Sequence, residues 1–453
     1  MTFVLAVLLT TLVGWLVIEP WLRSGWTAGL ALGFAAGAGI LSLQMLFYGL
    51  ARLPWHPAAL LLPWAPLCFW RLRRWPVFSK IDRPNWIEWI ALAACCIAPL
   101  AWLPYERVMP LHTQNWDAWA IWLFKAKAFY LENNLAGFLT RAGEFPCQPS
   151  YPLLIPLYGT FLYKLAGAPA DHLAKAVSPC FFFALLGAFY YLARRLGTRP
   201  VALVFTAMLA NLHMVNIVAF ELAGYADTAL SVYLLLGAGF LYAWWKEGET
   251  ADLALASLFS SLAAWTKNEG LFFLAGVGAI IVARLLCRRE GWRAWAVAAL
   301  WPALAVVPWM VARRLYDVPG SDIVAGPLAW RNLGPGLESI LLQAAKPSVY
   351  NLTFWFFLAS LPLFRRAGLD GRWWLLPGLA FWQLAGLAGA YLSGRNEIQW
   401  WIGTSLDRIL SQIAPLALLA PALVTAAWAT RRAAVTAKKP PTAPVRRDQR
   451  KRR

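Results

Sequence analysis

Apolar stretches of about 20 residues recur along this chain, and they constrain its fold more than any other feature. Hydrophobic residues make up 60% of the sequence and charged residues only 14%, and the mean hydropathy is +0.54. A soluble domain cannot hide so much apolar surface, because interior volume grows too slowly with chain length. The stretches are continuous Ala, Leu, Phe and Trp runs rather than short alternating strands, so membrane-spanning helices are expected.

We therefore expect an all-α polytopic membrane protein with about 12–13 transmembrane helices. The expected spans lie near residues 3–20, 26–50, 87–105, 173–193, 200–219, 227–245, 252–266, 270–286, 295–312, 350–364, 373–392 and 406–430. Two further apolar segments, 57–70 and 151–166, contain prolines and are ambiguous. The chain has no Lys or Arg before Arg23, so residues 3–20 look like a retained span rather than a signal peptide.

The distribution of Lys and Arg predicts the orientation of these spans. With the basic tail 431–453 placed in the cytoplasm, alternating sides give 26 basic and eight acidic residues inside, against 13 of each outside. This alternation holds only if 151–166 does not cross, so we expect one long outer loop, 106–172, that contains interfacial helices. The positive charge is thus a topology signal and a contact for anionic lipid, not a nucleic-acid surface.

The six cysteines suggest neither a disulfide framework nor a metal site. Cys95 and Cys96 are adjacent within an expected span, and no metal-ligand spacing appears. A divalent metal is left open.

The first outer loop carries the leading catalytic candidate, Asp117, within Asn115-Trp-Asp-Ala-Trp119. The residues that follow have helical period, with Trp119, Trp122, Ala126 and Phe129 on one apolar stripe and Lys125 and Lys127 beside it. A Trp-rich amphipathic helix at the end of a span is expected to lie in the membrane interface. Asp117 is then either a first-turn acid in a helix capped by Asn115 or a general base at the membrane surface.

Other ionisable residues fall on the same expected side. Lys267 and Glu269 occupy a very short link between two spans, as a neutralising pair or as functional groups. Arg408 enters an apolar span and needs an anion, for which Asp407 or a lipid-linked phosphate would serve. The remaining candidates on this side are Glu221, Asp227 and Arg395.

The order of these motifs resembles the GT-C membrane glycosyltransferases, the group that contains protein O-mannosyltransferases and lipid A aminoarabinose transferases. It runs from Asp117 in a Trp-rich interfacial helix through Tyr151-Pro-Leu-Leu, Gly224-Tyr-Ala-Asp227-Thr and Thr266-Lys-Asn-Glu-Gly270 to Asp407-Arg408. The resemblance covers roughly residues 87–430, with 1–86 as an N-terminal transmembrane extension and 431–453 as a basic tail.

The resemblance implies transfer of a sugar from a polyprenyl-phosphate or pyrophosphate carrier to an acceptor hydroxyl on a glycan, lipid or protein. Asp117 would match the base that deprotonates the acceptor. Asp227 would help to bind the acceptor or a metal, with Glu221 and Glu269 as further acids of that side. Lys267 and Arg408 would hold the donor phosphate, with Arg395 as a third candidate.

Two other classes stay open. One is a transporter or flippase of lipid-linked saccharides, which should show internal repeats and mid-span charges. The other is an O-antigen polymerase or ligase, for which arginines and a histidine in large outer loops are expected. For the glycosyltransferase we expect a bacterial inner membrane location, with the site facing the periplasm and the tail in the cytoplasm.

Overall fold

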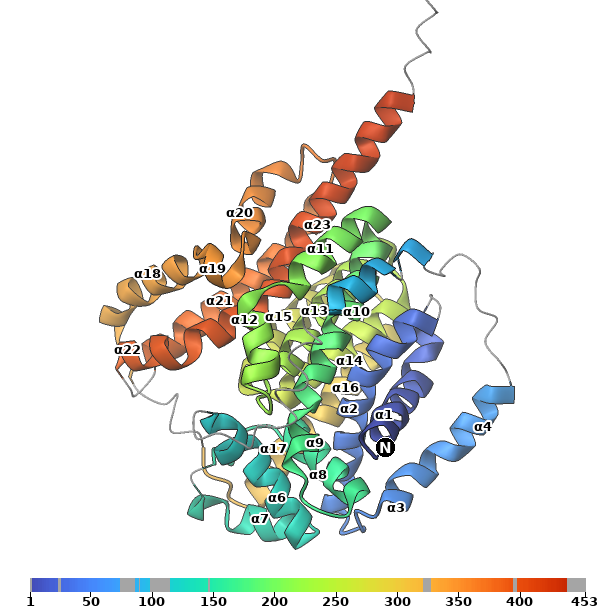
Figure 1. Cartoon of the computed structure of the whole chain (residues 1–453), viewed down its shortest axis with the longest axis vertical. Helices are drawn as coiled ribbons and strands as arrows, with labels where there is room; N and C mark the ends of the chain where they lie inside the picture. The colour runs from blue at the N-terminus through green and yellow to red at the C-terminus, as the bar shows by residue number, and fades with distance from the viewer. Residues whose placement is uncertain are drawn as a thin grey trace, which may run out of the picture.

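Helices account for all the regular secondary structure in the part of the chain that the structure describes. A computed structural model (Figure 1) describes residues 2–22, 26–73, 86–88, 90–97, 115–145, 147–320, 327–393 and 397–437. The expectation of an all-α polytopic membrane protein is confirmed, because long apolar helices dominate these residues.

Eight helices among the described residues are long and apolar enough to cross a membrane. They are Thr2–Trp21 (α1 Thr2–Ile18 with η1 Glu19–Trp21), Gly29–Leu50 (within α2 Trp26–Leu50), Asp171–Leu196 (α9 Asp171–Lys175 with α10 Val177–Leu196), Asp227–Glu247 (α13), Asn268–Arg288 (α15), Trp292–Leu315 (α16 Trp292–Ala305 with α17 Val307–Leu315), Gly371–Ser393 (η8 Gly371–Trp374 with α21 Leu375–Ser393) and Ile398–Val435 (α22 Ile398–Trp401, η9 Ile402–Leu406 and most of α23 Asp407–Ala437). The pair α11 Arg199–Ala210 and His213–Glu221 (α12 His213–Asn216 with η6 Ile217–Glu221) is bent by 65° and makes a ninth if it is counted as one broken span rather than a re-entrant loop.

The remaining expected spans are shorter in the structure. Helix α14, Thr250–Thr266, has 17 residues, and α20, Thr353–Leu363, has 11. At 1.5 Å per residue α20 extends roughly 16 Å, about half of a hydrocarbon core. The expected span 87–105 lies partly outside the described residues, although 86–88 and 90–97 are helical.

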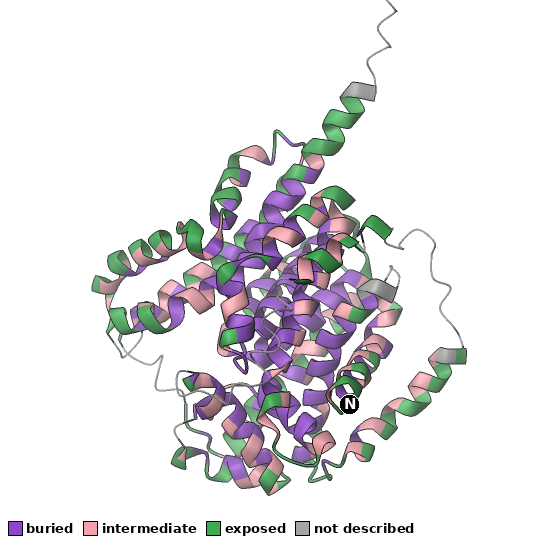
Figure 2. Ribbon diagram, in the orientation of Figure 1, coloured by how far each residue is buried: buried purple, intermediate pink, exposed green. Residues whose placement is uncertain are grey.

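Helix α13 forms the centre of the bundle. Each of its residues from Asp227 to Trp244 is buried, as Figure 2 shows in purple. Helices α10, α14 and α23 pack around it. A Cβ at Gly237 would lie 2.6 Å from Ser260 Oγ of α14, so the close approach of these two helices requires glycine there. A helix that is apolar on all sides fits only at such a buried position.

The two ends of the bundle differ in charge. At one end Arg195 donates to Asp252 at 2.6 Å and to Glu247 at 2.9 Å, and Arg284 donates to the carbonyl of Trp244. We call this the basic end. The opposite end, where α13 begins and α14 ends, is the site end. Arg195 and Arg284 thus lie at the same end of the bundle, as the expected alternation has them.

Residues 57–73 run between these two ends as α3 (Pro57–Leu61), η2 (Leu62–Trp64) and α4 (Ala65–Arg73). At the site end, a Cβ on Gly49 would lie 2.9 Å from Leu135 and Trp55 side chains. At the basic end, Arg71 Nη1 lies 2.8 Å from Glu19 Oε2. The ambiguous segment thus links opposite ends of the bundle.

The first long loop holds short helices at the site end: η4 (Asp117–Trp122), α6 (Leu123–Glu132), α7 (Ala136–Thr140), η5 (Ala142–Glu144) and α8 (Leu154–Ala166). Helix α8 has 13 residues, about 20 Å, which fits a segment that does not cross. Lys125, expected beside the apolar stripe, is fully buried with Trp122 and Phe129. Between α17 and α21, the site end also carries η7 (Trp330–Asn332), α18 (Leu333–Ala344) and α19 (Pro347–Tyr350).

Candidate active site

Three segments in the described part of the chain are π-helical, and each borders a predicted site residue. Helix η4 begins at Asp117, η6 ends at Glu221, and η9 ends at Leu406, two residues before Arg408. All three lie at the site end. π-Helical turns are rare, and where they occur they are frequently found at functional sites.

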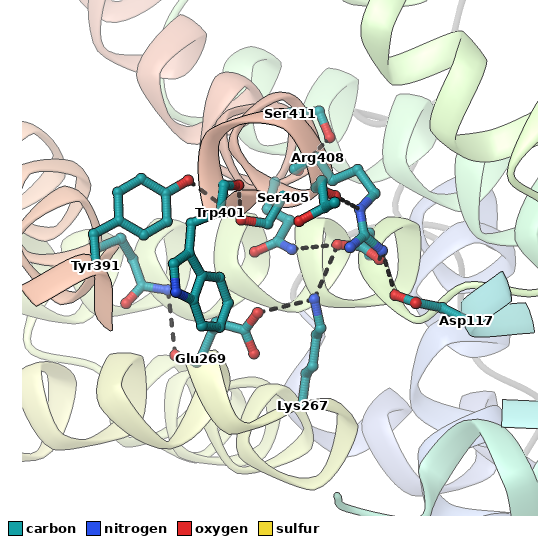
Figure 3. A network of polar contacts seen from close by, with 12 residues as sticks. Asp117, Lys267, Glu269, Tyr391, Trp401, Ser405, Arg408 and Ser411 are labelled. Atoms are coloured by element: carbon teal, nitrogen blue, oxygen red, sulfur yellow. Dashed lines mark hydrogen bonds and ion pairs between the residues drawn. The ribbon is translucent and has the colours of Figure 1, made fainter. Parts of the chain in front are cut away.

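Arg408 joins two of the predicted acids. Its Nη1 donates to Asp117 Oδ2 at 2.5 Å (Figure 3). The same nitrogen lies 3.8 Å from Asp227 Oδ2. The Asp117 side chain is 24% exposed, Arg408 15% and Asp227 0%. The guanidinium therefore lies between a carboxylate that solvent reaches and one that it does not.

Lys267 makes a second bridge on the other side of Asp227. Its Nζ lies 3.1 Å from Asp227 Oδ1 and 2.8 Å from Glu269 Oε1. Gln412 Nε2 donates to the same Asp227 oxygen at 2.5 Å. We call Asp117, Asp227, Lys267, Glu269 and Arg408 the charged cluster.

The cluster holds three carboxylates and two cations, drawn from η4, α13, the α14–α15 link, the first turn of α15 and α23. Burial opposes the charge of Lys267, but the carboxylates of Asp227 and Glu269 outweigh it and raise the pKa of Lys267 above its ordinary value. Lys267 is therefore a permanent cation at neutral pH.

Backbone contacts attach η4 to the loop before α13. The Asn115 side-chain amide donates to the Glu221 carbonyl at 2.8 Å, and the Asp117 amide donates to the Tyr225 hydroxyl at 3.4 Å. The simpler interpretation expected the Asn115 side chain to cap η4. Its amide instead binds the Glu221 carbonyl, so the side chain makes no such cap. It joins two loops that lie far apart in the sequence.

The structure thus gathers five of the predicted site residues: Asp117, Asp227, Lys267, Glu269 and Arg408. Glu221 is exposed, and the contact above uses only its backbone carbonyl. Arg395 lies outside the described residues.

Asp407 is not the partner of Arg408. Its carboxylate accepts a hydrogen bond from Gln343, and its carbonyl accepts one from the Tyr350 hydroxyl at 2.7 Å. Asp407 therefore binds residues of α18 and α19, while Arg408 binds Asp117 of η4 and faces Asp227 of α13. Lys267 and Glu269 do form the ion pair that one of the two interpretations expected. Lys267 also pairs with the buried Asp227, so the two residues are not an isolated pair.

Sequence reasoning missed Gln412 and the role of Tyr225. Gln412 lies one helical turn after Arg408, so both side chains share a face of α23. A glutamine at that spacing in an apolar span was the available signal. Tyr225 belongs to the Gly224–Asp227 motif, and its ring centroid lies 4.9 Å from the Arg408 guanidinium.

Within the described residues, no group of three or more His, Cys, Asp or Glu side chains could hold a metal ion. Metal dependence therefore stays open. No protein-family model matches the chain, and no curated protein matches it significantly.

Proposed function

We propose that this protein is an integral membrane glycosyltransferase of the GT-C type. It would move a sugar from a polyprenyl-phosphate or pyrophosphate carrier to an acceptor hydroxyl. The observation that carries the proposal is the position of Arg408, whose guanidinium reaches the partly exposed carboxylate of Asp117 and the buried carboxylate of Asp227 together. A cation and an accessible base thereby meet at the end of a membrane bundle.

The two cations suit a leaving phosphate. Negative charge develops on the phosphate oxygen as its bond to the sugar breaks, and fixed cations near that oxygen lower the barrier. Arg408 can bind phosphate with several N–H donors, whereas Lys267 acts as a compact charge. Asp227 holds both side chains in place from the buried side.

Asp117 suits the acceptor side. In the resting cluster its carboxylate is bound to Arg408. A donor phosphate that takes over this guanidinium releases Asp117, and the freed carboxylate can then accept the proton of an acceptor hydroxyl. Donor binding would thus precede activation of the acceptor.

The reaction is a single displacement. The acceptor oxygen forms a bond to the anomeric carbon while the bond from that carbon to the carrier phosphate breaks. The bonding electrons move to the phosphate oxygen, and the acceptor proton moves to Asp117. Inversion at the anomeric carbon follows.

The remaining acids receive narrower roles. Asp227 is fully buried, so we assign it the positioning of Lys267 and Arg408 rather than direct contact with the acceptor. Glu269, with 32% of its side chain exposed, can exchange with phosphate at Lys267 as Asp117 does at Arg408. The acceptor can be a glycan, lipid or protein.

We further propose that the basic end and the tail lie in the cytoplasm and that the site end faces the outside. For a bacterial inner membrane this is the periplasm. The basic end carries Arg194, Arg195, Arg284, Arg288 and Arg372. An excess of Lys and Arg is typical of a cytoplasmic face.

The test has two stages, with the full chain in lipid nanodiscs. Binding of polyprenyl phosphate should exceed that of a polyprenol of equal length, and Arg408→Ala and Lys267→Ala should each weaken it about tenfold or more. Radiolabelled lipid-linked sugars from source membranes should then be consumed by wild type but not by Asp117→Asn. Equal binding of the phosphate and the alcohol, or full transfer by Asp117→Asn, would overturn the proposal.

A further inference from the structure

Tyr225 lies in the short link between η6 and α13, where the backbone turns sharply. The preceding residue, Gly224, has φ +98°, a backbone conformation that residues other than glycine rarely adopt. A Cβ at Gly224 would also lie 3.0 Å from Ala118 Cβ of η4. Glycine is therefore needed both for the turn and for the close approach of η4.

Ser178 of α10 holds this turn from the other side. The Gly224 amide donates to Ser178 Oγ at 2.9 Å, and Ser178 Oγ donates to the Tyr225 carbonyl at 3.5 Å. One hydroxyl thus binds the amide of Gly224 and the carbonyl of Tyr225, one on each side of the peptide bond that joins them. The backbone of Tyr225 is fixed by contacts that have no catalytic role of their own.

The fixed backbone places the Tyr225 side chain between the two halves of the proposed site. Its ring centroid lies 4.9 Å from Arg408 Cζ, and its hydroxyl accepts the Asp117 amide hydrogen at 3.4 Å. The residue is 6% exposed. Burial, followed by the negative charge of Asp117, raises the pKa of Tyr225 to about 12, so the hydroxyl stays protonated at working pH.

We infer that Tyr225 is a positioning residue that aligns the donor-phosphate arginine and the catalytic aspartate with each other. The inference rests on the proposed function. The ring covers one face of the Arg408 guanidinium by a cation–π contact, and the N–H groups at its edge remain available to Asp117, Asp227 and a donor phosphate.

The hydroxyl has a separate task at the start of η4. It receives the Asp117 amide, a backbone donor at the first residue of a π-helix. This contact fixes the backbone of the proposed base relative to Arg408. Ring and hydroxyl therefore act on different steps, the ring on donor binding and the hydroxyl on transfer.

Two substitutions separate these tasks. Tyr225→Phe keeps the ring and removes the hydroxyl, so polyprenyl phosphate affinity should stay within about twofold while single-turnover transfer slows about tenfold. Tyr225→Leu removes both, and affinity should also fall, by about 5- to 30-fold, the range of a desolvated cation–π contact. Tyr130→Phe on α6, whose hydroxyl bonds the Gly167 carbonyl away from the cluster, is the matched control and should change neither quantity.

Affinity is measured with polyprenyl phosphate, and transfer with radiolabelled lipid-linked sugars from source membranes at saturation, all in nanodiscs. Equal effects of the Phe and Leu variants on affinity and rate would overturn the separation of tasks. Unchanged affinity in Tyr225→Leu, with Arg408→Ala still weakening binding, would refute the inference alone. Unchanged affinity in Arg408→Ala would refute the proposed function itself.

Discussion

Arg408 Nη1 lies 2.5 Å from Asp117 Oδ2, across 291 residues of sequence, and this contact connects the interfacial loop to the last long helix of the bundle. The pair is partly exposed, whereas the second acid near Arg408, Asp227, is fully buried. Because an exposed ion pair exchanges more readily than a buried one, the Asp117 side of Arg408 is where an incoming anion would bind.

This geometry predicts that Asp117→Asn binds polyprenyl phosphate more tightly than wild type, although it transfers no sugar. Removal of the carboxylate frees the guanidinium, and an affinity gain of about threefold to tenfold is expected because the lost contact is partly exposed. Binding is measured by titration of the carrier into nanodiscs.

Glu221→Gln provides the control for this experiment. It removes the same charge from the site end, but Glu221 is exposed and contacts Asn115 only through its carbonyl. If both variants gain affinity equally, general electrostatics explains the effect and the exchange at Arg408 is wrong.

A second prediction concerns the buried side of the cluster. Asp227→Asn should lower thermal stability strongly, because the buried ammonium of Lys267 then has Glu269 as its one remaining carboxylate partner in the cluster. Removing one partner of a buried ion pair costs about 3–5 kcal/mol. Gln412→Leu removes the hydrogen bond that Gln412 donates to Asp227 Oδ1 and should cost only about 1–2 kcal/mol.

Thermal unfolding in detergent, followed by tryptophan fluorescence, measures both variants. The double variant Asp227→Asn/Lys267→Met should recover part of the loss, because it removes the unpaired cation as well. A smaller loss for Asp227→Asn than for Gln412→Leu would contradict the assigned role of Asp227.

The sidedness of the site residues could be predicted from the sequence. Asp117, Asp227, Lys267 and Arg408 all lie next to the ends of apolar stretches, and counting spans from the basic tail places those ends together. Because each span ends at one of only two membrane surfaces, residues far apart in the sequence can be assigned to the same surface by counting spans. Their assembly into one cluster follows that expectation.

The pairing within the cluster could not be predicted in the same way. Asp407 is adjacent to Arg408 in sequence, yet successive residues on a helix point about 100° apart and do not face each other. Helical geometry already argued against that pair, but only packing of α23 on α13 and η4 reveals the acids that replace it.

Lys125 illustrates a different point. It lies three residues after Trp122 and four before Phe129, which places it on their buried face. Lys125 was expected beside the apolar stripe, and its helical spacing already pointed to the buried face on which the structure has it.

The third prediction tests the orientation of the bundle. In a variant without the six native cysteines, Leu131→Cys on α6 should react with an impermeant maleimide added to intact cells. Val435→Cys near the end of α23 should react only after permeabilisation. Both side chains are exposed, at 74% and 59%, so accessibility to the reagent does not limit either reaction. Labelling of both from the same side would contradict the proposed topology.

The last prediction concerns stability against pH. Lys125 is fully buried, its Nζ donates to the Gln148 carbonyl at 2.7 Å, and the rings of Trp122 and Tyr151 lie near it. Burial lowers the pKa of Lys125 from 10.5 to about 7, an effect that Cys147 partly opposes. The unfolded chain, with an ordinary lysine pKa near 10.4, therefore binds more protons than the folded one between about pH 7 and 10.

Stability should thus rise with pH across that window, by a few kcal/mol, and stay flat with respect to this group below pH 7, where both states are protonated. Lys125→Met should remove this rise. Lys127→Met, which changes the exposed neighbour paired with Asp171, should keep it. Burial also raises the pKa values of Cys147 and Tyr151, which makes stability fall as pH passes their unfolded values, but all three proteins keep both residues, so the comparison isolates Lys125. Thermal unfolding of the three proteins from pH 6 to 9.5 measures the difference, and parallel profiles for wild type and Lys125→Met would show that Lys125 is protonated equally in both states.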